Sequence, residues 1–187
     1  MRTLLFGIAV VALSLLVIRA AWLMRDTPLG VKGERSATQQ IAYTIEEAGT
    51  VLDLSGSGMT GVPMAVFRRT ELRELDLSGN SLQGSLPAEI RHLTELRVLS
   101  LANNNFTGVP AEIGQLQELQ VLDLSTNPIT GLPIELGNLR SLQVLDLRGT
   151  DYSKDDLAII RAGLPEDVTV YTDETPLEQD KGPAIDQ

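Results

Sequence analysis

Leucine and polar residues alternate in short stretches that return along the middle of the chain. The stretch LRELDLSGN at 72–80 recurs as LRVLSLANN at 96–104, as LQVLDLSTN at 119–127 and as LQVLDLRGT at 142–150. A weaker copy begins at Gly49 and keeps Leu52 and Leu54. The five starts lie 23 or 24 residues apart, which identifies an internal repeat with one supersecondary element in each unit.

Inside each copy the hydrophobic pattern has a period of two residues. Leu75 and Leu77 alternate with Glu74, Asp76 and Ser78, which predicts a short strand with one buried face. A strand of this length is not stable alone. We therefore expect five of them to stack side by side as a parallel sheet over one continuous core.

The second half of each unit predicts an extended return segment on the outer side of the core. Pro63, Pro87, Pro110 and Pro133 each follow a valine or leucine, and a further aliphatic residue comes three positions after each proline. Proline has no backbone N–H, so it suits a segment with no strand to join. The aliphatic residues then cover the core from that side.

Taken together, these residues resemble the leucine-rich-repeat family, whose units read LxxLxLxxNxLxxLPxxIxxL. The resemblance covers Gly49 to Asp151, and the departures at Gly49, Ser57, Arg69 and Thr150 fall in the end units. Four units resemble the short versions common in bacteria. The 24-residue unit with LQGSLP at 82–87 is similar to the plant-receptor version.

This resemblance implies an α/β fold, a right-handed solenoid with a short parallel sheet on its concave face. It also implies that Asn80, Asn104 and Asn127 form an internal ladder with a structural role. An amide side chain at a turn can satisfy backbone groups that the turn leaves unpaired.

Both ends of the array are expected to carry caps, within a repeat domain at 36–171. Ser36 to Gln39 has capping-box form, and apolar residues follow at helical spacing, so we expect a cap helix over 36–48 before the five repeats at 49–151. A carboxy-terminal cap over 152–171 should hold a helix that opens at Ser153 and a last short strand. The acidic tail at 172–187 is expected to be disordered.

The first 24 residues predict a membrane segment. The run at 3–24 is apolar except at Arg19 and is long enough to span a bilayer as an anchor. A cleaved signal peptide is the alternative, although the residues before Ala20 and Ala21 make a poor cleavage site. A polar linker at 25–35 follows.

The sequence leaves open on which side of the membrane the repeat domain lies. Basic residues after the apolar run favour a cytoplasmic repeat domain, whereas a short near-terminal run with a basic start favours export. We expect a single-pass anchor with the repeat domain on the extracytoplasmic side; the cytoplasmic side, or secretion after cleavage, is the alternative.

Composition narrows the classes of partner and of chemistry. All 25 acidic residues and only 12 of the 15 basic ones follow Arg25, so a nucleic-acid partner is not expected. The chain has no cysteine, and His92 is its one histidine. We therefore expect no metal site, no cofactor and no catalytic residues, and we interpret His92 as a surface residue of the outer face.

The strand positions that alternate with leucine predict the binding surface. Each strand should point three side chains at solvent, which places an aspartate row beside a valine row. The candidate binding residues are Asp53, Glu74, Asp76, Val98, Ser100, Val121, Asp123, Val144, Asp146 and Arg148. The alternative interpretation is that LDLS is simply the common sequence of this repeat, and that its small side chains only permit tight stacking of the strands.

These observations predict a non-catalytic, membrane-tethered module that binds a protein or peptide, with basic character favoured by the aspartates. The alternative is a structural cell-envelope component or membrane-complex subunit whose anchor makes the main contacts.

Overall fold

The structure is a computed structural model that describes residues 49–174. The membrane segment at 1–24, the linker at 25–35, the cap helix at 36–48 and the tail from residue 175 onward lie outside the described residues. Among residues 49–174, no helix has the length and apolar character needed to cross a bilayer.

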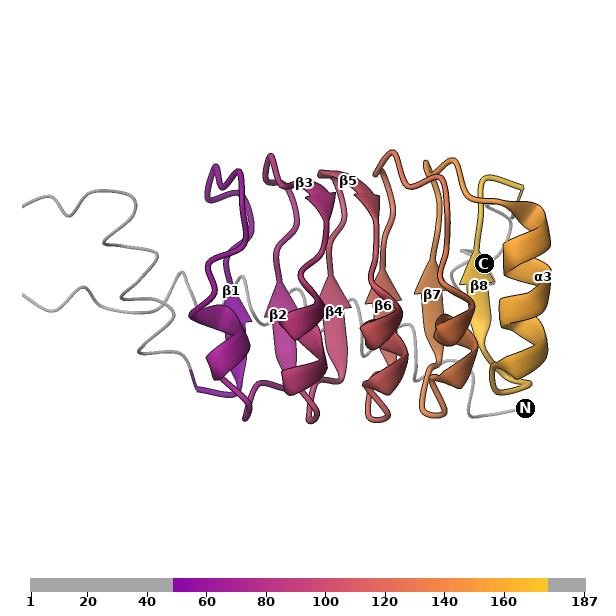
Figure 1. The fold of residues 1–187 in the computed structure, drawn as a ribbon, viewed down its shortest axis with the longest axis horizontal. Helices are drawn as coiled ribbons and strands as arrows, with labels where there is room; N and C mark the ends of the chain where they lie inside the picture. The colour runs from indigo at the N-terminus through magenta and orange to yellow at the C-terminus, as the bar shows by residue number, and fades with distance from the viewer. Residues whose placement is uncertain (1–48, 175–187) are drawn as a thin grey trace, which may run out of the picture.

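A parallel sheet of six strands runs the length of the described chain. Its strands, in spatial order, are β1 (Val51–Asp53), β2 (Glu74–Asp76), β4 (Val98–Ser100), β6 (Val121–Asp123), β7 (Val144–Asp146) and β8 (Thr169–Tyr171). The central leucines Leu52, Leu75, Leu99, Leu122 and Leu145 pair in register from each strand to the next. The predicted stacking of repeat units is therefore confirmed (Figure 1).

The core is a column of aliphatic side chains between the sheet and the outer segments. Leu75, Leu99, Leu122 and Leu145 are at most 1% exposed, and so are Leu77, Leu101, Leu124 and Leu147 in the row behind them. Each fully buried leucine contributes on the order of 1.5–3 kcal/mol of transfer free energy. Because every unit supplies the same rows, the units close one shared interior that none could close alone.

Short 3₁₀ helices form the outer side of the solenoid. They are η1 (Val66–Arg68), η2 (Ala88–His92), η3 (Ala111–Gln115) and η4 (Ile134–Asn138). The carbonyl oxygens of Pro87, Pro110 and Pro133 accept from the backbone N–H three residues on, at 3.1 Å in each case. The prolines thus end an extended segment, as their lack of an N–H predicts, and start each helix with the aliphatic residue facing inward.

The three asparagines form a ladder along one edge of the core. Asn104 Nδ2 lies 2.9 Å from the Leu77 carbonyl oxygen of the preceding unit, and its Oδ1 accepts from the Leu82 N–H at 3.0 Å. Asn127 and Asn80 make equivalent bonds, each reaching one unit back. In the last unit the hydroxyl of Thr150 donates to Leu147 within the same unit.

A second, two-stranded parallel sheet joins the two middle units. It consists of β3 (Gln83–Ser85) and β5 (Asn105–Gly108), and its register shifts between Gly84 and Ser85. The sequence did not indicate this sheet. The Asn105 N–H donates to Leu82 at 2.8 Å, but Pro128 follows Asn127 as Asn105 follows Asn104. Proline has no N–H for that bond, so the second sheet does not continue into the next unit.

A helix and a strand close the carboxy-terminal end, where the sequence indicated both. α3 (Lys154–Gly163) begins at Ser153, whose hydroxyl accepts from the Asp156 N–H at 3.3 Å. It packs on η4 through glycines: a Cβ on Gly163 would lie 2.8 Å from the Gly137 carbonyl oxygen. β8 then extends the sheet beside β7.

The expectation of disorder from residue 172 onward is wrong for its first three residues. Thr172 is only 7% exposed. The Asp173 carboxylate accepts from the Gly149 N–H at 2.8 Å, and Glu174 pairs with Lys154 at 2.6 Å. The acidic composition suggested a solvated tail, but here the acidic side chains bind groups of the last unit.

Candidate functional site

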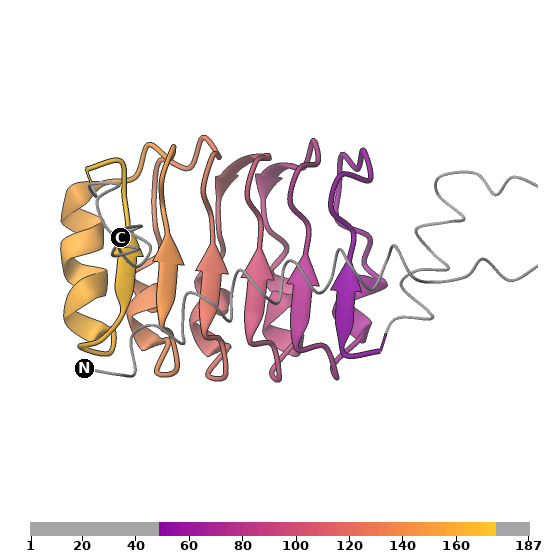
Figure 2. The same ribbon diagram turned by 180° about the vertical axis from the view of Figure 1, so that it is seen from behind.

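The concave face carries three side-chain rows held in register by the sheet. The middle row is Asp53, Asp76, Ser100, Asp123 and Asp146, each paired with the next. Adjacent strands lie about 4.8 Å apart, so neighbouring carboxylates of this row are close. Figure 2 shows the strands that bear these rows side by side across the face.

Three predicted binding residues are less accessible than strand alternation suggested. Ser100 and Asp146 are 7% exposed and Val121 is 8% exposed. Ser100 is a short side chain between two aspartates, and Val121 lies between Val98 and Val144 in register. The expectation that every alternate residue is open to solvent is wrong for these three.

Each aspartate of the middle row has a local hydrogen-bonding role. Asp53 Oδ1 accepts from the N–H of Ser55 at 2.9 Å, and Asp76 Oδ1 accepts from that of Ser78 at 2.8 Å. Asp123 and Asp146 make the same bond two residues on. One carboxylate oxygen thus holds the backbone where the strand ends, while Asp53, Asp76 and Asp123 stay partly exposed. This structural role therefore accounts in part for the presence of aspartate at these positions.

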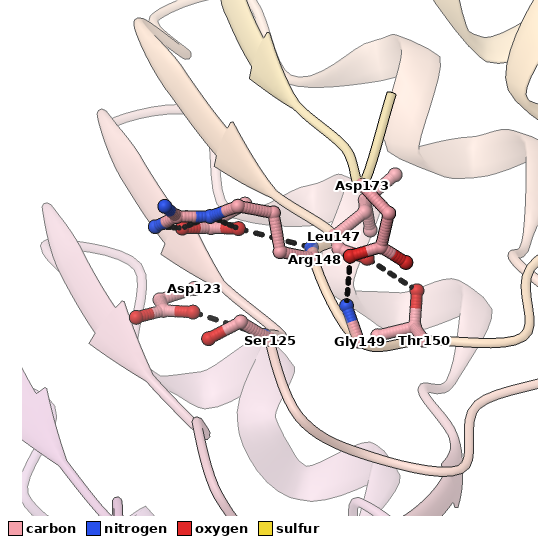
Figure 3. A network of polar contacts seen from close by, with 8 residues as sticks. Asp123, Ser125, Leu147, Arg148, Gly149, Thr150 and Asp173 are labelled. Carbon is pink, nitrogen blue, oxygen red and sulfur yellow. Dashed lines mark hydrogen bonds and ion pairs between the residues drawn. The ribbon is translucent and has the colours of Figure 1, made fainter. Parts of the chain in front are cut away.

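Arg148 lies at the carboxy-terminal end of the middle row and pairs with its last aspartate. Its Nε donates to both carboxylate oxygens of Asp146 at 3.0 and 3.1 Å, and its Nη2 also binds that carboxylate. The guanidinium lies 5.2 Å from the centre of the Tyr171 ring on β8, a cation–π distance. In Figure 3, Arg148 lies just beyond the end of β7, and Asp123 lies on the adjacent strand β6. Asp146 is therefore neutralised within the fold.

Burial also changes the titration of two acidic residues of this face. Burial raises the pKa of the Asp123 carboxyl, with a smaller contribution from the nearby charge of Asp146, while hydrogen bonds from Ser125 and the charge of Arg148 oppose the shift. Burial likewise raises the pKa of Glu74. Neither group gains enough from its surroundings to offset the cost of holding a charge there.

Three of the partly exposed acidic residues of this face lie together in the first two units. Asp53 and Asp76 are register neighbours, Glu74 stands beside Val51 in the adjacent row, and all three carboxylates are partly exposed. Val51 is 39% exposed. We call Val51, Asp53, Glu74 and Asp76 the acidic patch. It is the part of the predicted surface where charge and apolar area are both open.

Residues 49–174 offer few other candidates for a chemical site. His92 is exposed at the end of η2 on the outer side, as the sequence indicated, away from the sheet face. Among residues 49–174, no group of three or more histidine and acidic side chains is arranged to hold a metal ion.

Comparison with solved structures returns proteins of this architecture. A chain of the BIR3–SERK2 complex from Arabidopsis thaliana is 33% identical over 65% of this chain and 66% of its own, with a TM-score of 0.53. The plant peptide hormone receptor RGFR1, solved in complex with RGF2, is 32% identical over 66% of this chain, with a TM-score of 0.54. Internalin C2 of Listeria monocytogenes, at 24% identity, 66% coverage of this chain and a TM-score of 0.55, shares the fold.

Two of these proteins extend beyond the part that this chain matches. The chain spans 24% of RGFR1 and 51% of internalin C2. No curated protein sequence matches the chain. A family model described as a leucine-rich repeat region, however, matches residues 50–150. Repeat spacing, stacked strands and asparagine ladder agree with that match, and the chain belongs to the leucine-rich-repeat family.

Proposed function

We propose that this protein is a non-catalytic binding module, tethered to a membrane by residues 1–24, that recognises a protein or peptide through its concave face. The observation that carries the proposal is the acidic patch: three partly exposed carboxylates and an exposed valine on one rigid sheet. Sites on regular strands hold their geometry better than sites on loops. RGFR1, a plant peptide hormone receptor of similar architecture that was solved in complex with RGF2, supports this use of the fold.

The chemistry of the patch favours a partner with a basic segment. Asp53, Glu74 and Asp76 lie together, whereas the one basic side chain of the predicted binding set, Arg148, is bound to Asp146 at the other end. A cationic side chain would be steered toward the first two units. Val98 and Val144, partly exposed in the adjacent row, would supply apolar area for the rest of the partner.

The proposed tether limits where a partner can be found. Eleven residues, 25–35, separate the anchor from the expected cap helix. Fully extended, they span at most about 36–40 Å. Because only the expected cap helix at 36–48 separates this linker from the first unit, the acidic patch would stay near the bilayer surface. A membrane protein, or a protein held at the membrane, is therefore the favoured partner, on the extracytoplasmic side.

Partner capture from solubilised membranes tests the proposal. Asp76→Asn combined with Asp123→Asn removes two charges but keeps the oxygen that accepts from the backbone, so stability should not fall. We expect at least a tenfold loss of affinity for the captured partner. A matched control, Glu118→Gln with Glu166→Gln, makes the same charge change on exposed loops off the sheet face. Equal binding by all three proteins would exclude the concave face.

A further inference from the structure

Glu74 interrupts a row of valines on the concave face. From β1 to β7 this row, which lies beside the aspartates, consists of Val51, Glu74, Val98, Val121 and Val144, paired in register. The neighbours of Glu74 on either side are therefore valines on strands about 4.8 Å away. Valine is favoured in strands and glutamate is not. Strand preference and the chemistry of the row thus both predict valine at this position.

The Glu74 carboxylate has no partner among the described residues. Each aspartate of the middle row accepts a backbone N–H two residues on, whereas no hydrogen bond or ion pair within residues 49–174 involves the side chain of Glu74. Arg73, which precedes it, pairs with Glu95 at 3.6 Å. Arg148 is bound to Asp146 three strands further along the sheet. Burial raises the pKa of Glu74, and no neighbouring charge opposes that shift.

A structural role does not account for this glutamate. A partly buried carboxylate without a partner destabilises the folded state. A valine in its place would remove that cost and would extend the apolar row by one residue. Residues that lower stability in this way are typical of surfaces that bind another molecule.

We infer that Glu74 is the residue that determines specificity on the concave face, and that it binds an arginine side chain of the partner. This inference rests on the function proposed above. Within the described chain both carboxylate oxygens of Glu74 are free to accept two parallel bonds from a guanidinium, whereas Asp53 and Asp76 each use one oxygen on their own backbone. Val51 and Val98 flank the carboxylate and can pack against the methylene groups of the arginine.

The same geometry favours arginine over lysine. A lysine ammonium is a compact point charge and makes no paired, planar contact with a carboxylate. A guanidinium matches both oxygens at once and loses less of its hydration when it lies between apolar side chains. The partner chemistry that fits Glu74 is therefore an arginine within an otherwise uncharged, apolar segment.

Glu74→Val separates a binding role from a structural one. It should raise the thermal midpoint of the full chain in detergent by about 2–4 °C, because it removes an uncompensated charge and adds apolar area. The matched control, Glu118→Val, makes the same substitution on an exposed turn off the sheet face and should not raise the midpoint. A lower midpoint for Glu74→Val would show that the glutamate stabilises the fold and would overturn the inference.

Selection from a random peptide library on the full chain tests the chemistry of the partner. Peptides that bind the native chain should share an arginine. Replacing that arginine with citrulline, which keeps the shape but has no charge, should weaken binding at least tenfold, and lysine should restore only part of the loss. The Glu118→Val chain should select arginine again, whereas the Glu74→Val chain should not.

A double-mutant cycle with Glu74→Gln shows whether the two groups are in contact. In the Glu74→Gln chain, citrulline in the peptide should cause little further loss of affinity. Additive losses, or selected peptides without a shared arginine, would overturn the inference. The concave-face proposal would still stand if Asp76→Asn with Asp123→Asn weakened the same peptides. Failure of the native chain to select any peptide would overturn both.

Discussion

Asn104 Nδ2 donates to the carbonyl oxygen of Leu77, 27 residues earlier and one unit back, at 2.9 Å. The same nitrogen lies 3.1 Å from the carbonyl oxygen of Leu101 in its own unit. One amide group therefore satisfies two backbone oxygens at the edge of a leucine core. This links the turn of each unit to the stacking of the next.

Within the asparagine ladder, Asn104→Ala and Asn127→Ala should lower the free energy of unfolding more than Asn80→Ala does. Asn104 is 7% exposed and Asn127 is 2% exposed, whereas Asn80 is only partly buried. Each buried backbone group left unpaired costs about 1–3 kcal/mol. We expect Asn104→Ala to lower the free energy of unfolding by about 3 kcal/mol in denaturant titrations, and Asn80→Ala by clearly less. A larger loss in Asn80→Ala would contradict this ranking.

Gly114 should tolerate no side chain. A Cβ there would lie 2.3 Å from the Glu135 carbonyl oxygen, where η3 packs on η4. Because that atom belongs to the backbone, Gly114→Ala should push neighbouring units apart and cost about 2–4 kcal/mol. Gly131→Ala, with no atom within 4 Å, is the matched control and should change the thermal midpoint little. Equal midpoints for both variants would refute the close contact.

The carboxylate of Asp76 should be replaceable by an amide but not by a methyl group. Asp76→Asn keeps the oxygen that accepts from the Ser78 N–H, whereas Asp76→Ala removes it. We expect Asp76→Ala to cost about 1 kcal/mol and Asp76→Asn to fall within about 0.5 kcal/mol of the native chain. Urea titration of the three proteins measures both differences. If Asn costs as much as Ala, the charge itself stabilises the turn.

Asp123 should make the protein less stable as its carboxyl ionises. Burial raises its pKa above the ordinary value of 3.8, so the folded state binds its proton more tightly than the unfolded state. This stabilisation is complete below the unfolded pKa and is lost as pH rises through the folded pKa. Free energies of unfolding measured between pH 3.8 and 7 should therefore fall less steeply with pH in Asp123→Asn than in the native chain. Parallel curves would show that Asp123 titrates normally.

The repeat spacing predicted the large features of the fold because burial alone determines them. Leu75, Leu99, Leu122 and Leu145 must face one interior, and only stacked parallel strands achieve this. The second sheet was not predicted because it depends on which backbone N–H groups donate to the neighbouring unit. Pro128 has no such N–H, and this ends the sheet. The sequence analysis also missed the left-handed backbone at Asn103 and Thr126, with φ of 54° in both. Glycine at the equivalent position of the other units, Gly56, Gly79 and Gly149, was the signal for it.

The candidate surface was predictable only in part. Strand alternation correctly gave the rows, but sequence alone could not separate a binding aspartate from one that holds its own backbone, since either role suits the same residue. Asp146 illustrates the limit. Its neutralisation depends on Arg148 folding back two residues, and on Tyr171 in the next strand beneath that guanidinium. Such compensation depends on side-chain geometry, which periodicity does not encode.

Site-specific photo-cross-linking in intact membranes tests the proposed binding surface most directly. A photoreactive residue at Val98, on the concave face beside Glu74, should yield a specific cross-linked partner. The same residue at His92, exposed on the outer side, should yield none. Cross-links from His92 but not Val98, or contacts confined to residues 3–24, would contradict recognition by the sheet and favour a subunit held by its anchor.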